Sequence, residues 1–336
     1  MSRTKSSQFT LIASIISGAV ILAFASWMFL NRQFVSDTVV TLFYQPSSSV
    51  RAIEDRVAFT GDGKLIFFAT QPEVLDADSF NERCPRQEVQ NPILGCYVGD
   101  DRIYIYSITN EDLEGIEEVT AAHEMLHAAW KRLDTKQRKE LEPELHRIYE
   151  SMSDSELKQR MEYYERTQPG EFYNELHSII GTEVEVVGEE LDTYYARYFE
   201  NRQAVIGFYY QYDAVFQELE DQTDSLYKQM QALGESIMAQ RSEYDVKLAS
   251  LSADINVFNS RADNGDFASE QAFYSERAQL MQRSNLLDAD RRALNGDIDA
   301  YNDLRERYII VAAQLERLDR SVDSFQAINS APTLTQ

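Results

Sequence analysis

The hydrophobic pattern along the chain begins with an uncharged apolar run between Phe9 and Leu30. At about 1.5 Å per residue, a helix of this length can cross a hydrocarbon core of about 30 Å. The pattern therefore predicts a transmembrane helix over residues 9–30, which follows a short tail (1–8) and precedes a juxtamembrane connector (31–51).

Cations flank this run unevenly and indicate its orientation. Arg3, Lys5 and the free amine precede it, whereas Arg32 is the only nearby cation after it. The positive-inside rule then places the N-terminus in the cytoplasm and the bulk of the chain outside the cytoplasm. A cleavable signal peptide is the alternative, because Ala23-Phe24-Ala25 resembles a cleavage site. Either interpretation exports the rest of the chain.

Short runs with strand character replace this pattern between residues 52 and 109. Gly61-Asp62-Gly63 and Gly99-Asp100-Asp101 interrupt the runs, and such residues are typical of tight turns between antiparallel strands. The sequence therefore predicts two β-hairpins, which pair residues 56–60 with 64–69 and residues 94–98 with 102–108.

A helical period follows Asn110, where acidic residues crowd the start of the segment, as suits the N-terminal end of a helix dipole. Apolar residues then recur at spacings of three and four, at Val119, Ala122, Leu126, Ala129 and Leu133. We expect an amphipathic helix here and further helices after it, with breaks at Pro143 and at Gln168-Pro169-Gly170.

A seven-residue apolar repeat runs through residues 216–258 and again through residues 273–322. Such a repeat is typical of long supercoiled helices, and Asn264-Gly265-Asp266 between the two segments is a turn signal. We therefore expect an antiparallel coiled-coil hairpin over residues 201–329 and a disordered tail over residues 330–336.

One part of this hairpin has polar residues where its seam should be apolar. Glu276, Arg283 and Asp290 occupy inward positions of the second segment. We therefore expect looser packing in that part. Together the patterns predict an α+β chain that is predominantly α, with a small strand-containing helical domain over residues 52–200.

The charge balance excludes one class of partner. The 336 residues include 32 basic and 56 acidic side chains, a net charge of −24, and the acids are spread along the chain. A polyanion would be repelled by this surface, so we expect no nucleic-acid partner.

The two cysteines, Cys84 and Cys96, lie close together in the segment that we expect to be exported. A disulfide is the natural pairing in an oxidising compartment. Two free thiols are the alternative, and a zinc site is less supported because no histidine stands beside them.

His123-Glu124-Met125-Leu126-His127 forms an HExxH pattern inside the predicted amphipathic helix. Histidines at positions i and i+4 share one helical face, where both imidazoles can bind one Zn²⁺ ion. Glu124 lies beside them and is expected to act as the general base that takes a proton from the water that zinc activates.

This motif and its uncharged flanks resemble the zincin clan of metallopeptidases. The resemblance covers residues 103–133 closely and extends more weakly to about residue 183. It implies a zincin-like domain, peptide-bond hydrolysis, and a strand before the helix along whose edge the substrate backbone lies. Ile103 to Ile108 is similar to that strand in position.

The third zinc ligand is expected from a later helix, as in the gluzincin branch of that clan. Asn174-Glu175-Leu176-His177-Ser178 resembles the gluzincin pattern, with Glu175 as ligand and Ser178 as the small residue. The alternatives for the third ligand are Glu171, His177 and Glu183. The candidates for a donor to the oxyanion are Tyr163, Tyr164, Tyr173 and His177.

The function predicted from the sequence is a membrane-anchored zinc metalloendopeptidase. Its partners would be a peptide or protein substrate, membrane lipid around residues 9–30, and a protein or second copy bound through the coiled coil. The alternative is a cell-surface interaction or scaffold protein whose coiled coil carries the function and whose zincin-like domain is not catalytic.

Overall fold

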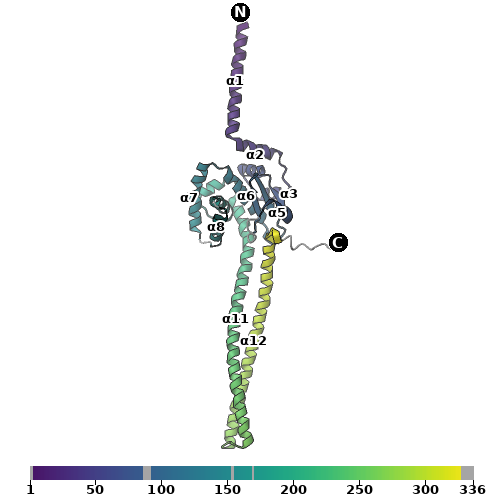
Figure 1. Ribbon diagram of the computed structural model, residues 1–336, viewed down its shortest axis with the longest axis vertical. Coiled ribbons are helices and arrows are strands. Elements are labelled where there is room, and N and C mark those ends of the chain that lie inside the picture. Colours follow the sequence, from purple (N-terminus) through teal and green to yellow (C-terminus); the bar gives the residue numbers. More distant parts are fainter. Residues whose placement is uncertain (1–2, 86–91, 153–154, 169, 327–336) are drawn as a thin grey trace, which may run out of the picture. The chain divides into compact units, whose positions relative to one another are not determined.

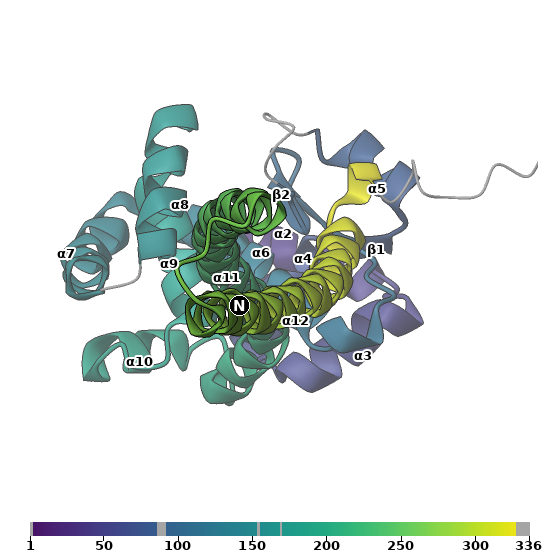
Figure 2. The same ribbon diagram turned by 90° about the horizontal axis from the view of Figure 1, so that it is seen from below.

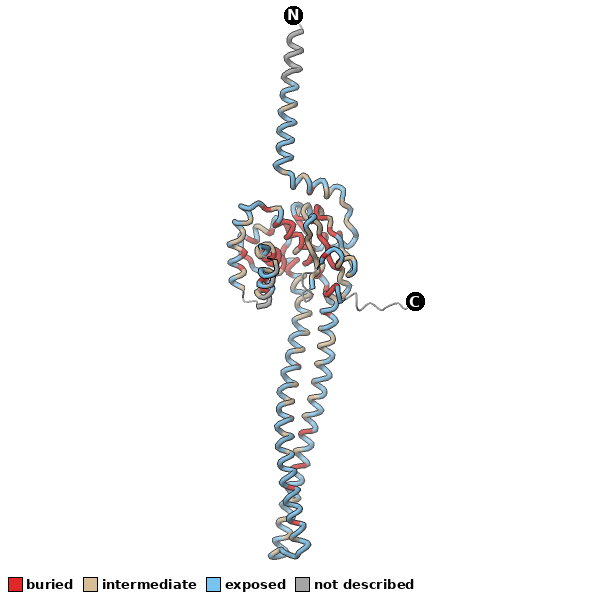
Figure 3. The backbone as a smooth tube through the Cα atoms, viewed as in Figure 1, coloured by how far each residue is buried: buried red, intermediate tan, exposed pale blue. Residues whose placement is uncertain are grey.

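The computed structural model describes residues 3–85, 92–152, 155–168 and 170–326. The chain divides into two units, one comprising Met1–Val215 with Asp319–Gln336 and the other comprising Phe216–Leu318 (Figure 1). The first unit contains nearly all of the buried core, as Figure 3 shows. The predicted tail over residues 330–336 lies outside the described residues.

The chain begins with helix α1 (Arg3–Leu30), whose Ala13–Leu30 stretch has a mean hydropathy of 2.0 and no buried residue. Its length and composition suit a membrane span or a signal sequence. The predicted juxtamembrane connector contains a second helix, α2 (Arg32–Phe43), which the sequence pattern did not predict. Asn31 separates the two helices, and its side-chain amide donates to the Trp27 carbonyl.

The predicted hairpin over residues 56–69 is wrong, because two helices, α3 (Ser48–Val57) and α4 (Gly61–Ala69), occupy this region. The Thr60 hydroxyl accepts a hydrogen bond from the Gly63 amide and caps α4. Gly63 is required for close approach instead of a turn, since a Cβ there would lie 2.3 Å from the Tyr198 carbonyl oxygen.

The second predicted hairpin is confirmed. Strands β2 (Gly95–Val98) and β3 (Arg102–Tyr106) pair antiparallel, with Gly95 opposite Ile105. A short strand that the sequence did not reveal, β1 (Glu73–Leu75), pairs parallel to β3 and completes the order β1-β3-β2. Because β3 is central, the expectation that a substrate adds to the edge of Ile103 to Ile108 is wrong.

The predicted disulfide between Cys84 and Cys96 is confirmed. It joins the end of helix α5 (Ala77–Arg83) to β2, and both cysteines pack in a small apolar cluster with Phe80. Closing a loop of this length stabilises the fold by about 3 kcal/mol in the chain-entropy account. The disulfide thus holds the outer strand of the sheet in place.

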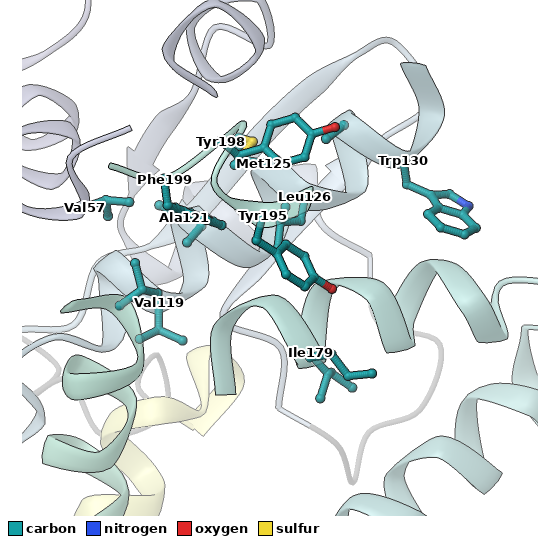
Figure 4. Packing of buried hydrophobic residues seen from close by; sticks show 14 of the residues in the cluster. Val57, Val119, Ala121, Met125, Leu126, Trp130, Ile179, Tyr195, Tyr198 and Phe199 are labelled. Atoms are coloured by element: carbon teal, nitrogen blue, oxygen red, sulfur yellow. The ribbon is translucent and has the colours of Figure 1, made fainter. Parts of the chain in front are cut away.

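The predicted amphipathic helix is α6 (Ile116–Arg132), which follows a 3-10 turn at Glu111–Leu113. It crosses the middle of the first unit, with α3 and α4 to one side and α7 (Thr135–Ser151) and α8 (Ser155–Thr167) to the other (Figure 2). Its apolar residues form much of the core, and Figure 4 shows Met125 and Leu126 among them.

The helix break predicted at Pro143 is wrong, because Pro143 lies inside α7. A capping box at Asp134 starts this helix, and the buried residues Leu145 and Ile148 pack its later turns against the core. The break predicted around Gly170 is confirmed: α8 ends at Thr167 and α9 (Phe172–Glu183) begins after a left-handed Gly170. Pro169 itself lies outside the described residues.

Two long helices follow the short helix α10 (Glu189–Tyr195). They are α11 (Arg202–Asn264) and α12 (Glu270–Val322), and the predicted turn lies between them. Gly265 adopts a positive φ of 74°, a conformation that glycine favours. The second unit is therefore an antiparallel helical hairpin.

The polar seam positions of this hairpin are paired across it instead of merely being loosely packed. Side-chain contacts of 2.6 to 2.9 Å join residues of α11 to residues of α12, at Gln240 with Asp297, Lys247 with Asp290, Asp254 with Arg283, and Arg261 with Glu276. From one pair to the next, the residue number rises by seven in α11 and falls by seven in α12. This polar ladder defines the register of the two helices.

We predict that reversing one charge of the ladder weakens the hairpin locally. Arg283→Asp places two acids opposite each other, and an exposed pair of this kind contributes about 0.2–1 kcal/mol. Hydrogen exchange on the full chain should accelerate up to about fivefold near Asp254. Adding Asp254→Arg should restore protection, whereas Arg292→Asp, at an exposed position, should change little; equal effects of both single variants would contradict the ladder.

Candidate metal centre

The centre begins with two histidines one turn apart on α6. The ring centroids of His123 and His127 lie 4.7 Å apart, and the two Nε2 atoms are separated by 3.1 Å. The side chain of His127 is buried, whereas His123 is partly exposed. The helical spacing therefore directs both Nε2 atoms toward one point, which is reached from the His123 side.

Helix α9 brings a carboxylate to the same point because it packs closely against α6. A Cβ at Gly181 would lie 2.3 Å from Cδ1 of Leu126 and 2.8 Å from Cε1 of Tyr195, so glycine allows this approach without displacing those buried side chains. The Glu175 Oε2 atom then lies 3.7 Å from Nε2 of each histidine. Glu175 is buried, like Ser178 one turn later.

These three side chains form a group that can hold a metal ion. Their ligating atoms all lie within 4.8 Å of one another. The Glu175 Oε2 atom is buried and has no hydrogen-bond partner among the described residues. A buried carboxylate oxygen without a donor is costly. A cation shared with the two imidazoles would satisfy it, so the donor set fits a metal.

The charges of the centre oppose the effect of burial. Burial alone lowers the pKa of His123, but the carboxylates of Glu175 and Glu124 outweigh it and raise this pKa overall. Burial likewise raises the pKa of Glu175, yet the imidazoles of His127 and His123 lower it overall. Glu175 is therefore ionised at neutral pH, and protons on the imidazole compete with a metal as the pH falls.

Asn174 and Ser178 orient the imidazole of His127. The His127 Nδ1 atom lies 3.0 Å from the Asn174 Oδ1 atom and 3.2 Å from the Ser178 hydroxyl. The Asn174 amide donates to Glu171, which fixes Oδ1 as the atom that faces the ring. Donation from Nδ1 assigns the ring proton to that atom and leaves the Nε2 lone pair for a ligand.

The three alternative third ligands are engaged elsewhere. Glu171 precedes the first turn of α9 and accepts from Asn174. His177 is fully buried, its Nε2 atom lies 2.9 Å from the Tyr194 hydroxyl, and burial lowers its pKa well below the usual value. Glu183 pairs with Arg160 of α8. None of the three belongs to the group of ligating atoms among the described residues.

Glu124 lies on the sheet side of the centre, in contact with β2. A Cβ at Gly95 would lie 2.8 Å from the Glu124 Cγ and 2.6 Å from the Thr120 methyl group. Burial dominates and raises the pKa of Glu124, although the imidazoles of His127 and His123 oppose this rise. A carboxyl group with a raised pKa holds a proton more readily than an ordinary one.

The backbone of β2 faces outward at these same residues. The Tyr106 amide donates to the Leu94 carbonyl, so this pair is a hydrogen-bonded one. Pairs alternate along an antiparallel ladder, and therefore Gly95 and Tyr97 direct their peptide groups away from β3. The outer edge of the sheet lies next to Glu124.

Tyr164 of α8 is a described phenol whose pKa responds to the charges of the centre. Burial raises its pKa most, and the carboxylates of Glu175 and Glu124 raise it further. Tyr173 packs its ring against neighbouring aromatic rings instead. The side chain of Tyr163 lies outside the described residues.

Several supporting residues were not identified from the sequence. Arg202, the first residue of α11, donates to the carbonyls of Val184 and Glu185 and thereby holds the C-terminal end of α9. Asn174 stood next to a predicted ligand without an assigned role, and Gly95 belonged only to a strand. Such roles depend on contacts between distant segments, for which a single sequence carries no local signal.

We predict that Asn174→Ala weakens metal binding by about 10- to 100-fold, because partners of a ligating histidine have effects of this size. Titration of the metal-free full chain with Zn²⁺ measures this. Glu171→Gln should have a smaller effect, since its amide oxygen still accepts from Asn174. Unchanged affinity in Asn174→Ala would contradict the orienting role.

Comparison with known proteins adds no relative to this description. No protein-family model matches the chain, and neither a curated protein nor a solved structure shows significant similarity to it.

Proposed function

We propose that the protein is a zinc-dependent metallopeptidase. The observation that carries this proposal is the convergence of His123, His127 and Glu175, with Glu124 beside them. Two imidazoles and one carboxylate are the ligand set of hydrolytic zinc sites, and an adjacent carboxylate is their usual base. The resemblance of the HExxH motif to the zincin clan supports the same assignment.

Different residues of the chain have different roles in the proposed hydrolysis. Zinc would be held by His123, His127 and Glu175, and would supply a Lewis acid that polarises the scissile carbonyl and acidifies water. Glu124 takes the proton from the attacking water and delivers it to the leaving amine. Tyr164 donates a hydrogen bond to the developing oxyanion from its neutral hydroxyl.

The substrate backbone adds to the outer edge of β2. The outward peptide groups of Gly95 and Tyr97 are suited to pairing with an extended peptide, and Glu124 lies beside them. This replaces the edge of β3 that the sequence suggested. The Cys84–Cys96 disulfide anchors the strand that receives the substrate.

Residues 9–30 anchor the protein in a membrane, with the N-terminus in the cytoplasm and the bulk of the chain outside it. The apolar length of α1 and the cations Arg3 and Lys5 before it support this orientation. The helical hairpin binds a protein partner or a second copy of the chain. If the centre binds zinc but does not hydrolyse peptides, the scaffold function becomes the better account.

We predict that Glu124→Gln retains about one Zn²⁺ per chain and loses peptide hydrolysis by several orders of magnitude, because the amide cannot accept the proton. His123→Ala should lose both the metal and peptide hydrolysis. Elemental analysis and cleavage of a peptide library measure the two properties. Full activity in Glu124→Gln, or no zinc in the wild-type protein, would refute the proposal.

We predict that Gly95→Ala lowers the rate of hydrolysis on the order of 100-fold while zinc stays bound. A methyl group would displace β2 from Glu124, and misplacement by about 1 Å has an effect of this size. Gly99→Ala is the matched control in the same hairpin, because no atom lies within 4 Å of its Cβ position. Equal rates in the two variants would contradict the role of β2.

A further inference from the structure

Helix α2 presents an apolar face that no described residue of the first unit covers. Four of its large apolar residues are about half or more exposed, at Phe34, Val39, Leu42 and Phe43. At about 100° per residue they fall within one half of the helix circumference, together with Val35 and Thr38. A surface helix of a soluble domain usually places its polar residues there.

The opposite half of α2 is fixed to the protein. Asp37 is buried and accepts two hydrogen bonds of 2.8 and 2.9 Å from the guanidinium of Arg132. The Gln33 amide donates to Asp37, and the Tyr44 hydroxyl, just after the helix, donates to the Pro72 carbonyl. The apolar half is therefore held outward by a buried ion pair on the other side.

Helix α1 joins α2 on the apolar side of α2. Asn31, Phe34, Thr38 and Leu42 are separated by three or four residues, so they follow one stripe along the helix. The connection to the apolar span of α1 lies at the start of this stripe. Trp27, in the last turn of α1, is a residue type that favours the boundary between lipid and water.

We propose that α2 lies in the interface of the bilayer that α1 enters, with its apolar face in lipid and its polar face on the protein. The only acid of α2 is the buried Asp37, and its only cation, Arg32, can extend its long stem to the headgroups. An apolar face of this kind buries about 5–10 Å into the boundary between headgroups and acyl chains.

Neutral lipid is the partner that the charges favour. A single cation on α2 gives little attraction to anionic headgroups, and the chain carries a net charge of −24, which such headgroups would repel. Binding therefore depends on buried apolar area instead of on charge. The binding of α2 to lipid does not depend on whether the metal centre is that of a peptidase.

The ion pair extends this arrangement to the metal centre. Arg132 stands in the last turn of α6, the helix that carries both histidines, and also bonds Asp101 in the turn between β2 and β3. A membrane-lying α2 thus holds the centre and the outer strand at a set height above the lipid. The polypeptides that reach it are membrane-proximal segments, an implication that rests on the proposed function.

The test places one fluorophore on the full chain in phosphatidylcholine vesicles. Cys84 and Cys96 are joined, so a new thiol from Leu42→Cys is labelled alone. Val186→Cys is the matched control, since Leu42 and Val186 are 77% and 79% exposed. Lipids carrying a quencher near the headgroup should quench the label at position 42 several-fold more than at position 186, and aqueous iodide should do the reverse.

Two outcomes would overturn the proposal. Equal quenching by iodide at both positions would mean that the face lies in water. Protection at position 42 from both iodide and lipid quenchers would mean that protein, such as a second copy, covers it. Phe43→Cys, at a residue that is 78% exposed, repeats the measurement if Leu42→Cys loses helical content.

Discussion

The close packing of α9 against α6 is the contact on which the rest of the centre depends. Gly181 lets the two helices approach, and Glu175 is thereby carried to the two histidines. The helices are separated in the chain by α7 and α8, so tertiary packing alone determines where the carboxylate lies. A centre assembled in this way exists only when the core is folded, so a metal ion held there would stabilise that core in turn.

On the other side of α6, the sheet places its outer strand next to Glu124. Its outer strand approaches Glu124 because Gly95 has no side chain, and the disulfide ties this strand to α5. A small sheet of three strands has little stability by itself. Covalent closure and packing on a buried helix compensate for its size and hold the strand that lies beside Glu124.

Some of these features could be predicted from sequence because they are local. The HExxH helix, the β2–β3 hairpin and the two long helices each repeat a short-range pattern of polar and apolar residues. The hairpin predicted over residues 56–69 is wrong because Gly61 and Gly63 lie in the first turn of a helix. Gly63 also leaves space for the backbone of Tyr198, which is far away in the sequence. β1 is too short for a period, and the roles of Asn174 and Arg202 arise only from tertiary contacts.

The polar ladder of the hairpin limits how the second unit can change in length. Each rung joins a position on α11 to one on α12, and both series advance by seven residues. An insertion of seven residues in α11 alone, between Gln240 and Lys247, would shift the later rungs by one step and place Lys247 opposite Arg283 and Asp254 opposite Glu276. The hairpin can therefore lengthen or shorten only in matched heptads on both helices, so its reach changes in steps of about 10 Å.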